Sequence, residues 1–367
     1  MESNQLTVWQ FFVLTISFIL GTSFFFIPGG LIAVAKQDAW IVPLWAGAAG
    51  ILNAFVWFRL SDQYPGLTLI QICTEAAGKA LGGVLALMYV AYFTQLSAFI
   101  TRNLGDFMKQ SLMRLTPLSV FHVIFLFIIV YAVTKGFETI ARSSEVLFPI
   151  VTATFIFVFG FALVEWDWGR FQGMFRMDVW KTVKETRSIF GFPFMEALCF
   201  LMLFPYVQKR KKSIFISALI IATLMLSVIT FFAIGVLGVY RASHDAYPMF
   251  VIVQELHIGL FLEHLESAVA LILLVAIFIK LSISYYCSVA GLCQLFQITD
   301  RMWLALAFVP IVAGFALGYE NMVENIEFSQ KYDFEYTVFF SLILPLFLLL
   351  LTWFKKRKGH RQENGSS

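Results

Sequence analysis

The chain has 367 residues, of which 60% are hydrophobic and only 13% are charged, and its mean hydropathy is +0.82. Soluble domains are roughly half apolar and about one quarter charged, and no water-soluble fold has enough interior for this apolar surplus. The formal net charge of +3 is too small to indicate a nucleic-acid partner. The composition therefore predicts an all-α integral membrane protein, with residues 1–367 forming a single membrane domain in contact with membrane lipids.

Apolar runs of membrane-spanning length follow one another along the whole chain. A bilayer core takes about 20 apolar residues per helix, and the sequence contains ten such runs. The predicted transmembrane helices cover residues 9–35, 40–58, 83–107, 118–134, 146–164, 187–206, 213–240, 268–290, 302–317 and 336–354. No polar stretch between them is long enough to form a separate soluble domain.

Lysine and arginine are distributed unevenly between the two sets of loops. If both termini are cytoplasmic, the cytoplasmic side carries about fourteen of these residues and the opposite side about nine. The two densest basic runs, residues 209–212 and 355–358, both fall on the cytoplasmic side. The positive-inside rule therefore predicts cytoplasmic termini, with residues 355–367 forming a short basic tail.

Two of the predicted helices carry glycine and proline within the span. The first contains Gly21, Thr22 and Ser23 followed by Pro28, Gly29 and Gly30, and the sixth contains Gly191, Phe192 and Pro193. Glycine and proline are common in membrane helices generally, which would explain either break alone. Breaks at matching places in spans one and six of ten indicate a five-plus-five inverted repeat, with a binding site at the unwound segments. The repeats would cover about residues 9–164 and 187–354.

Several short motifs resemble those of a known family. In the first span and the loop after it they are Leu20, Gly21 and Thr22, then Ile27 and Pro28, then Ala35, Lys36, Gln37, Asp38, Ala39, Trp40 and Ile41. Further along they are Tyr64, Pro65, Thr68, Leu69, Gly78, Lys79, Pro193, Phe194, Glu196, Phe200, Leu201, Phe204 and Pro205. From these residues the chain is similar to the endospore germination permeases, the B subunits of nutrient germinant receptors. The Gln-Asp-Ala-Trp element is the most specific motif, and Met195 stands where the family usually has glycine.

This resemblance implies the fold of the amino acid, polyamine and organocation (APC) transporter superfamily, a LeuT-like arrangement with broken helices one and six. It also implies an A subunit and a lipoprotein C subunit as partners. The expected location is the spore inner membrane or the cell membrane. A small nutrient germinant, an amino acid, is the expected ligand, and no cofactor is expected. The alternative is a proton-coupled amino acid transporter of the same superfamily, because both functions need a broken-helix pocket.

Two charged residues within predicted spans are candidates for a functional role, because charges at membrane depth are costly. Glu196 follows the break in span six, so freed backbone amides can orient it. Lys280 lies midway along span eight, with no other charge between Glu266 and Asp300. Some proton-coupled members of the superfamily replace a sodium ion between spans one and eight with a lysine. The resemblance thus implies that Lys280 is a built-in cation or a titrating group; the alternative is a lysine paired with a carboxylate only for packing.

A ligand site is expected where spans one, three, six and eight meet. This expectation follows from position in the implied fold. The candidate ligand-binding residues are Gly21, Thr22, Ser23, Tyr92, Ser97, Gly191, Phe192, Phe194, Ser282 and Tyr286. Polar residues in membrane helices also hydrogen-bond to neighbouring helices, which is the alternative role for each of them.

The remaining charged residues are expected to be solvated or interfacial. Arg102 and Asp106 are spaced as a local helical pair at the end of span three, and Glu145 precedes span five. One loop contains His244, Asp245, Glu255, His257, Glu263 and His264, but without a recognised metal-ligand spacing, so no metal site is expected. The acidic residues Glu320, Glu324, Glu327, Asp333 and Glu335 are expected on the surface, or facing a partner. No nucleophile elbow, phosphate-binding glycine loop or cysteine-rich motif is present, so an enzyme is not expected.

Overall fold

The computed structural model describes residues 5–207, 210–254 and 265–363. Within these ranges every regular element is a helix, and one isolated parallel bridge pairs Leu6 with Val207. The α-helices are α1 (Val8–Leu20), α2 (Ser23–Ala35), α3 (Val42–Gln63), α4 (Leu69–Ala77), α5 (Lys79–Phe107), α6 (Leu118–Thr134), α7 (Phe137–Ala162), α8 (Val179–Glu185), α9 (Lys211–His244), α10 (Pro248–Gln254), α11 (Leu265–Phe296), α12 (Arg301–Leu317), α13 (Met322–Lys331), α14 (Asp333–Val338) and α15 (Leu344–Glu363). The shorter 3₁₀ and π segments are η1 (Lys36–Ile41), η2 (Met108–Leu112), η3 (Leu163–Glu165), η4 (Trp168–Phe171), η5 (Phe190–Met195), η6 (Glu196–Met202), η7 (Phe204–Tyr206) and η8 (Phe339–Ile343).

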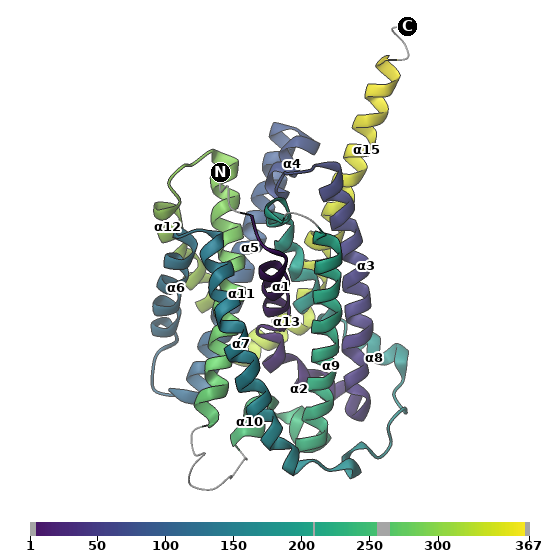
Figure 1. Cartoon of the computed structure of the whole chain (residues 1–367), viewed down its shortest axis with the longest axis vertical. Coiled ribbons are helices and arrows are strands. Elements are labelled where there is room, and N and C mark those ends of the chain that lie inside the picture. Colours follow the sequence, from purple (N-terminus) through teal and green to yellow (C-terminus); the bar gives the residue numbers. More distant parts are fainter. Residues whose placement is uncertain (1–4, 208–209, 255–264, 364–367) are drawn as a thin grey trace.

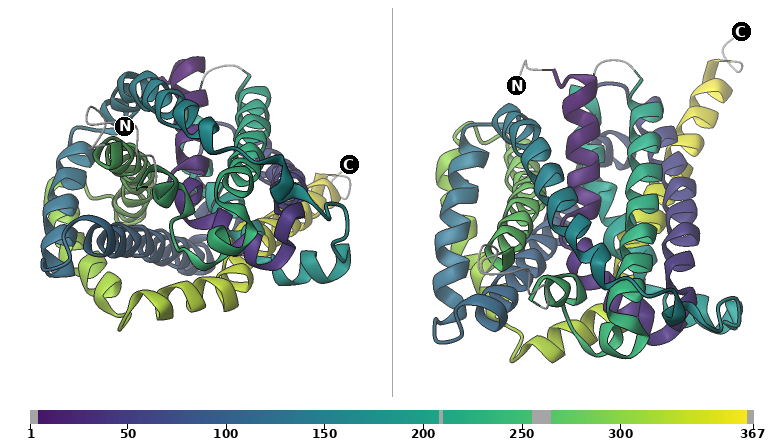
Figure 2. Two further views of the ribbon diagram at one scale, coloured as in Figure 1. Left: turned by 90° about the horizontal axis from the view of Figure 1, so that it is seen from below. Right: turned by 60° about the horizontal axis from the view of Figure 1, so that its bottom comes forward.

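The long helices run side by side between two ends of one bundle (Figure 1). The start of α1 and the end of α15 lie at the same end, here called the termini end. The turns around α2, α8 and α10 lie at the opposite end, here called the distal end. Helix α13 meets α12 at a bend of 95° and runs crosswise to the long helices (Figure 2).

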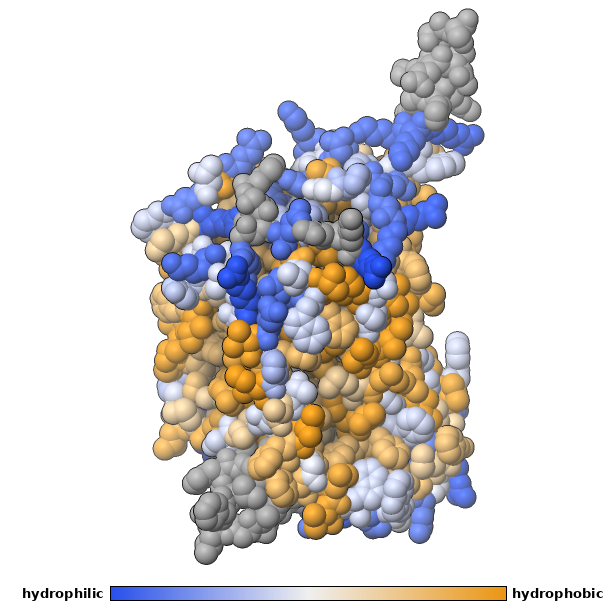
Figure 3. All heavy atoms as spheres, viewed as in Figure 1, coloured by the Kyte–Doolittle hydropathy of each residue, from blue (hydrophilic) through white to orange (hydrophobic). Residues whose placement is uncertain are grey.

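The outside of the bundle is apolar, as a lipid-facing surface requires. Leu52, Ile124 and Val228 are each more than half exposed, at 69%, 59% and 64%. Apolar residues dominate the middle of the face in Figure 3, and polar residues gather at the termini end. The chain is therefore a membrane protein whose apolar side chains face outward as well as inward.

Six helical stretches in the described ranges are long and apolar enough to cross a bilayer: Ser23–Gln63, Lys79–Leu112, Phe137–Glu165, Lys211–His244, Glu266–Phe296 and Asp333–Arg357. The bent pair Arg301–Leu317 and Met322–Phe328 adds a seventh if it counts as one span. Three shorter apolar helices, Val8–Leu20, Leu118–Thr134 and Phe190–Met202, occupy the places of the predicted spans one, four and six. The all-helical membrane fold is confirmed, while the exact number of ten crossings and the two repeat ranges stay predictions.

Both predicted helix breaks are present. Helix α1 ends at Leu20, and Gly21 has φ 0° and ψ −110°, so the backbone leaves the helix before α2 begins. In the sixth span Phe192 has φ −101° and ψ 116°, between helical residues on either side. Pro28 does not break the first span, because it lies inside α2. The break therefore depends on Gly21.

Helix ends differ from the predicted ones where polar residues continue a helix beyond the apolar run. Helix α7 begins at Phe137, nine residues before the predicted start at residue 146. Glu145 consequently lies inside α7, half-buried, and accepts a hydrogen bond from the Gln10 side chain at 3.0 Å. The prediction that Glu145 is solvated ahead of the helix is wrong.

Candidate functional site

The two helix breaks meet around one buried ion pair. The Nζ atom of Lys280 lies 2.6 Å from Oε2 of Glu196, and the two residues are 0% and 1% exposed. Lys280 comes from the middle of α11, and Glu196 begins η6 directly after the unwound segment. The Lys280 ammonium also lies 3.5 Å from the Thr22 hydroxyl at the first break. The structure thus joins spans one, six and eight through Lys280.

Aromatic rings surround the Lys280 ammonium on the remaining sides. Its Nζ atom lies 4.3 Å from the centre of the Phe192 ring and 5.3 Å from that of Phe18. A cation over an aromatic face is attracted by the ring quadrupole, and the attraction is stronger away from water. Phe192 therefore stabilises the charge and also covers it.

Gly21 is required at the first break by the position of Lys280. A Cβ atom at Gly21 would lie 3.2 Å from Cδ of Lys280 and 3.1 Å from the carbonyl oxygens of Ser17 and Phe18. The absence of a side chain lets the lysine stem pass close to the unwound backbone. Five of the predicted site residues, Gly21, Thr22, Phe192, Glu196 and Lys280, are brought together in this way.

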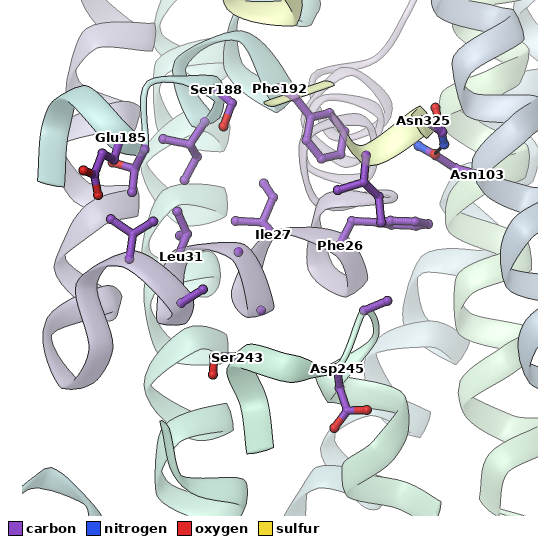
Figure 4. Close-up of a pocket in the computed structure, with 18 of the residues that line it drawn as sticks. Phe26, Ile27, Leu31, Asn103, Glu185, Ser188, Phe192, Ser243, Asp245 and Asn325 are labelled. Atoms are coloured by element: carbon purple, nitrogen blue, oxygen red, sulfur yellow. Dashed lines mark hydrogen bonds between the residues drawn. The ribbon is translucent and has the colours of Figure 1, made fainter. Parts of the chain in front are cut away.

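On the distal side of Phe192 lies a cavity of about 450 Å³, here called the distal cavity (Figure 4). Phe26, Ile27, Leu31, Phe99, Ile189 and Phe192 supply apolar walls. Asn103, Glu185, Ser188, Ser243, Asp245 and Asn325 supply polar groups. Phe192 lines this cavity and also covers Lys280, so its ring separates the cavity from the ion pair.

Several predicted ligand-binding residues are engaged elsewhere. The Ser23 hydroxyl donates to the carbonyl oxygens of Leu20 and Ile19, so it caps the end of α1. Ser97 donates to the Phe93 carbonyl at 2.8 Å and to the Ser284 hydroxyl at 3.0 Å, which ties α5 to α11. These hydroxyl groups have structural partners in this arrangement.

Phe194, Ser282 and Tyr286 differ from one another in their surroundings. Phe194 packs against Gly50 of α3, where a Cβ atom would lie 2.9 Å from Cβ of Phe194 and 3.2 Å from its ring. Tyr286 lies under Arg301, whose guanidinium is 5.8 Å from the Tyr286 ring centre. The Ser282 hydroxyl is buried and has no hydrogen-bond partner among the described residues. A role for these three residues in ligand binding stays a prediction.

Gly191 and Tyr92 face α14 at the start of the last span. A Cβ atom at Gly191 would lie 2.9 Å from Oγ1 of Thr337 and 3.0 Å from Oδ2 of Asp333. The Tyr92 ring stacks on Phe340, with ring centres 4.8 Å apart. Asp333 is therefore half-buried against the unwound segment rather than solvated, and the sequence-based prediction for it is wrong. Its position in an acidic loop gave no signal of this contact.

Arg102 and Asp106 form the predicted i, i+4 pair, at 2.9 Å, but they are 1% and 6% exposed and not interfacial. Arg102 also donates to the Tyr319 carbonyl at 2.6 Å, and Asp106 accepts from Asn325 at 3.2 Å. The pair thus fastens α5 to the corner between α12 and α13.

Of the three histidines predicted to share one loop, only His244 lies within the described residues. His244 is exposed and contacts Tyr240, while Glu255, His257, Glu263 and His264 lie outside the described residues. Glu324 and Glu327 are exposed, as expected for a solvated acidic surface.

The sequence matches a known protein family over most of its length. A profile of the spore permease family, described as spore germination protein, matches residues 5–324. The chain belongs to this family. The resemblance inferred from the sequence motifs is thereby confirmed.

Curated relatives align with this chain over nearly their whole length. Spore germination protein KB of Bacillus subtilis (strain 168) is 26% identical, and the alignment covers 99% of this chain and 98% of that protein. Spore germination protein B2 of the same organism is 24% identical, with 98% and 99% covered. These alignments therefore cover nearly the whole chain.

Solved structures with the same fold are transporters. MhsT in complex with L-phenylalanine has a TM-score of 0.67 at 14% identity, covering 95% of this chain and 98% of that one. MHP1, a nucleobase-cation-symport-1 family transporter with bromovinylhydantoin bound, has a TM-score of 0.66 at 12% identity, covering 92% and 78%. At these identities the likeness establishes the fold, which is the transporter type inferred from the two broken helices.

Proposed function

We propose that the chain is the membrane-embedded B subunit of a spore germinant receptor, which binds a small amino acid and triggers germination. The observation that carries this proposal is the Lys280–Glu196 ion pair, 2.6 Å long, at the two helix breaks. Charged side chains at membrane depth are energetically costly, so their presence there indicates a functional site. Family membership supplies the biological setting. The ligand site is centred on Gly21, Thr22, Phe192, Glu196 and Lys280.

The ion pair has the chemistry to recognise a zwitterion. An amino acid carries one carboxylate and one ammonium group, so it can enter between the partners. Its carboxylate would then pair with Lys280 and its ammonium with Glu196, which turns one ion pair into two. Charge-assisted hydrogen bonds of this kind are the stronger ones in proteins. A ligand lacking either charge leaves one buried partner without a counter-charge and binds more weakly.

Access to the ion pair runs from the distal cavity past Phe192. The cavity of about 450 Å³ has room for a small amino acid. The Phe192 ring must leave the Lys280 ammonium before the ligand can reach it, so binding favours a different arrangement of the unwound segment. That shift is the signal passed to the A subunit and the lipoprotein C subunit in the spore inner membrane.

Spores carrying Lys280→Met test the ligand site. The nutrient that germinates spores with the native chain is first identified from a panel of amino acids. Lys280→Met is expected to abolish the response to that amino acid or raise the required concentration at least about tenfold, as loss of a buried charge partner predicts. Lys331→Met is the matched control, because Lys331 pairs with Glu327 in an exposed position, with the lysine side chain 63% exposed. An unchanged concentration response in Lys280→Met spores with normal protein levels would overturn the assignment.

A proton-coupled amino acid transporter is the second candidate, favoured by the transporter fold of the solved neighbours. The two candidates are distinguished by uptake of a labelled amino acid into liposomes containing the purified chain alone. The receptor proposal expects binding without accumulation. Saturable accumulation driven by a proton gradient would establish the transporter instead.

A further inference from the structure

A second carboxylate lies beside the central ion pair without a counter-charge. Asp333 begins α14 and packs against the unwound segment at Gly191. Its Oδ2 atom is shielded from solvent and has no hydrogen-bond partner among the described residues. The next acidic residue on the same helix, Glu335, pairs with Arg187 at 2.8 Å, whereas no described basic side chain forms an ion pair with Asp333.

Asp333 and Glu196 line the same small cavity. Its volume is about 20 Å³, and Tyr92, Gln95 and Tyr336 lie on its wall with the two carboxylates. A cavity needs roughly 10–15 Å³ to hold one water molecule. The space therefore fits a single particle about the size of water.

Tyr92, which lines this cavity, carries a hydroxyl group that has no hydrogen-bond partner among the described residues. The residue is 2% exposed, and its hydroxyl oxygen is buried. Buried hydroxyl groups are nearly always satisfied, so an orphaned one beside a cavity indicates a bound species. Its ring is held by stacking on Phe340, so the hydroxyl is fixed rather than free to find another partner.

The charges around the cavity do not balance. Glu196 and Asp333 are two carboxylates, and the Lys280 ammonium, 2.6 Å from Glu196, is the single described cation that pairs with either of them. With both carboxylates ionised, one negative charge is left over in a region where an unpaired charge is costly. A single positive charge of small size would neutralise it.

We propose that Asp333, Glu196 and Tyr92 form a binding site for one small monovalent cation, either an inorganic ion or the ammonium group of a small amine. Carboxylate and hydroxyl oxygens are the donors that hard cations prefer. A monovalent ion is selected over a divalent one because Lys280 already offsets one of the two carboxylates. This site shares Glu196 with the proposed germinant site and in that respect rests on the proposed function. Cation binding by the purified chain is measured without germinant or partner subunits, so either proposal can fail while the other stands.

Thermal unfolding of the purified full-length protein in detergent tests the proposal. Melting is measured in sodium chloride, potassium chloride and methylamine hydrochloride, with choline chloride at equal ionic strength as the reference. A ligand that binds only the folded state raises the melting temperature as its concentration rises. At least one of the three salts is expected to raise the melting temperature above the choline value. A rise with sodium or potassium alone assigns an inorganic ion, and a rise with methylammonium assigns an amine head group.

Three variants decide whether the effect belongs to this site. Asp333→Asn is expected to remove the cation-dependent rise, and Glu335→Gln, whose native carboxylate side chain is 53% exposed on the same helix, is expected to keep it. Tyr92→Phe retains the ring and removes the hydroxyl, so the half-saturating cation concentration should rise about fivefold, as for a lost hydrogen bond. A rise that persists unchanged in Asp333→Asn overturns the proposal. So does the lack of any rise in the native protein, which would mean that the carboxylate holds a proton.

Discussion

Lys280 is stabilised in the membrane interior by three kinds of contact. Glu196 supplies the opposite charge at 2.6 Å, Thr22 a hydroxyl at 3.5 Å and Phe192 a ring face at 4.3 Å. Each contact comes from a helix break or from the turn next to one. The lysine therefore holds the two unwound segments to α11.

Removing only one charge of this pair should destabilise the protein strongly. Lys280→Met leaves Glu196 buried without a counter-charge, and such a loss costs about 3–5 kcal/mol. The double variant Lys280→Met with Glu196→Gln removes both charges, so it should recover much of the lost stability. Thermal unfolding of the purified variants in detergent measures the difference. Equal stability of the single and double variants would contradict a stabilising ion pair between the two side chains.

Charged residues inside apolar runs were predictable individually, but their surroundings were not. Glu196 and Lys280 are conspicuous in sequence because no other charged residue lies near them in their apolar runs. Asp333 looks like its solvated neighbours, since its burial arises from α14 packing on Gly191, a contact between residues far apart in the chain. Arg102 and Asp106 show the same effect: their spacing predicts the pair, whereas burial by the α12–α13 corner is a tertiary property.

Asp38 fixes the long distal loop between α7 and α8 to the end of the first span. Its carboxylate accepts hydrogen bonds from the backbone amides of Phe175, Arg176 and Met177, at 2.6, 3.0 and 3.1 Å. The residue is 3% exposed and lies in η1. This gives the Gln-Asp-Ala-Trp motif a structural role, namely anchoring a loop that has little regular structure of its own.

Asp38→Ala should release this loop. Loss of three charge-assisted hydrogen bonds, whose donors water can partly replace, is expected to cost about 1–3 kcal/mol. Trypsin should then cleave after Arg176 or Lys181 several times faster than in the native protein. Glu165→Gln is the matched control, because Glu165 is an exposed carboxylate of the same loop. Equal cleavage rates for Asp38→Ala and the native chain would show that the loop is held by other contacts.

Helix existence was predictable from apolar runs, and helix ends were less so. The start of α7 at Phe137 includes Glu138 and Arg142, which pair with each other in an exposed i, i+4 arrangement. A prediction from hydropathy leaves such charged turns out of the span, although the backbone there is already helical. The break at Phe192 was predictable because glycine and proline flank it, whereas Pro28 shows that proline alone does not end a membrane helix.

The bundle is more open at one end than at the other. The distal cavity reaches Phe192 from the distal end. At the termini end the two broken spans are tied together, because the Leu6 amide donates to the Tyr206 carbonyl at 2.8 Å. Access from the termini end would require this contact to separate. The structure therefore corresponds to the arrangement in which the ion pair is approached from the distal side.

The orientation of the whole molecule is the last prediction. The start of α1 and the end of α15 lie at one end of the bundle, so the chain crosses the membrane an even number of times, which ten crossings satisfy (Figure 1). The excess of lysine and arginine in the loops on that side predicts that both termini are cytoplasmic. A carboxyl-terminal alkaline phosphatase fusion, which is active only outside the cytoplasm, is expected to be inactive, and a green fluorescent protein fusion to fluoresce. The same phosphatase inserted at Trp168, in the exposed distal loop, should be active and serves as the control. An active carboxyl-terminal fusion would reverse the orientation, and the distal cavity would then face the cytoplasm.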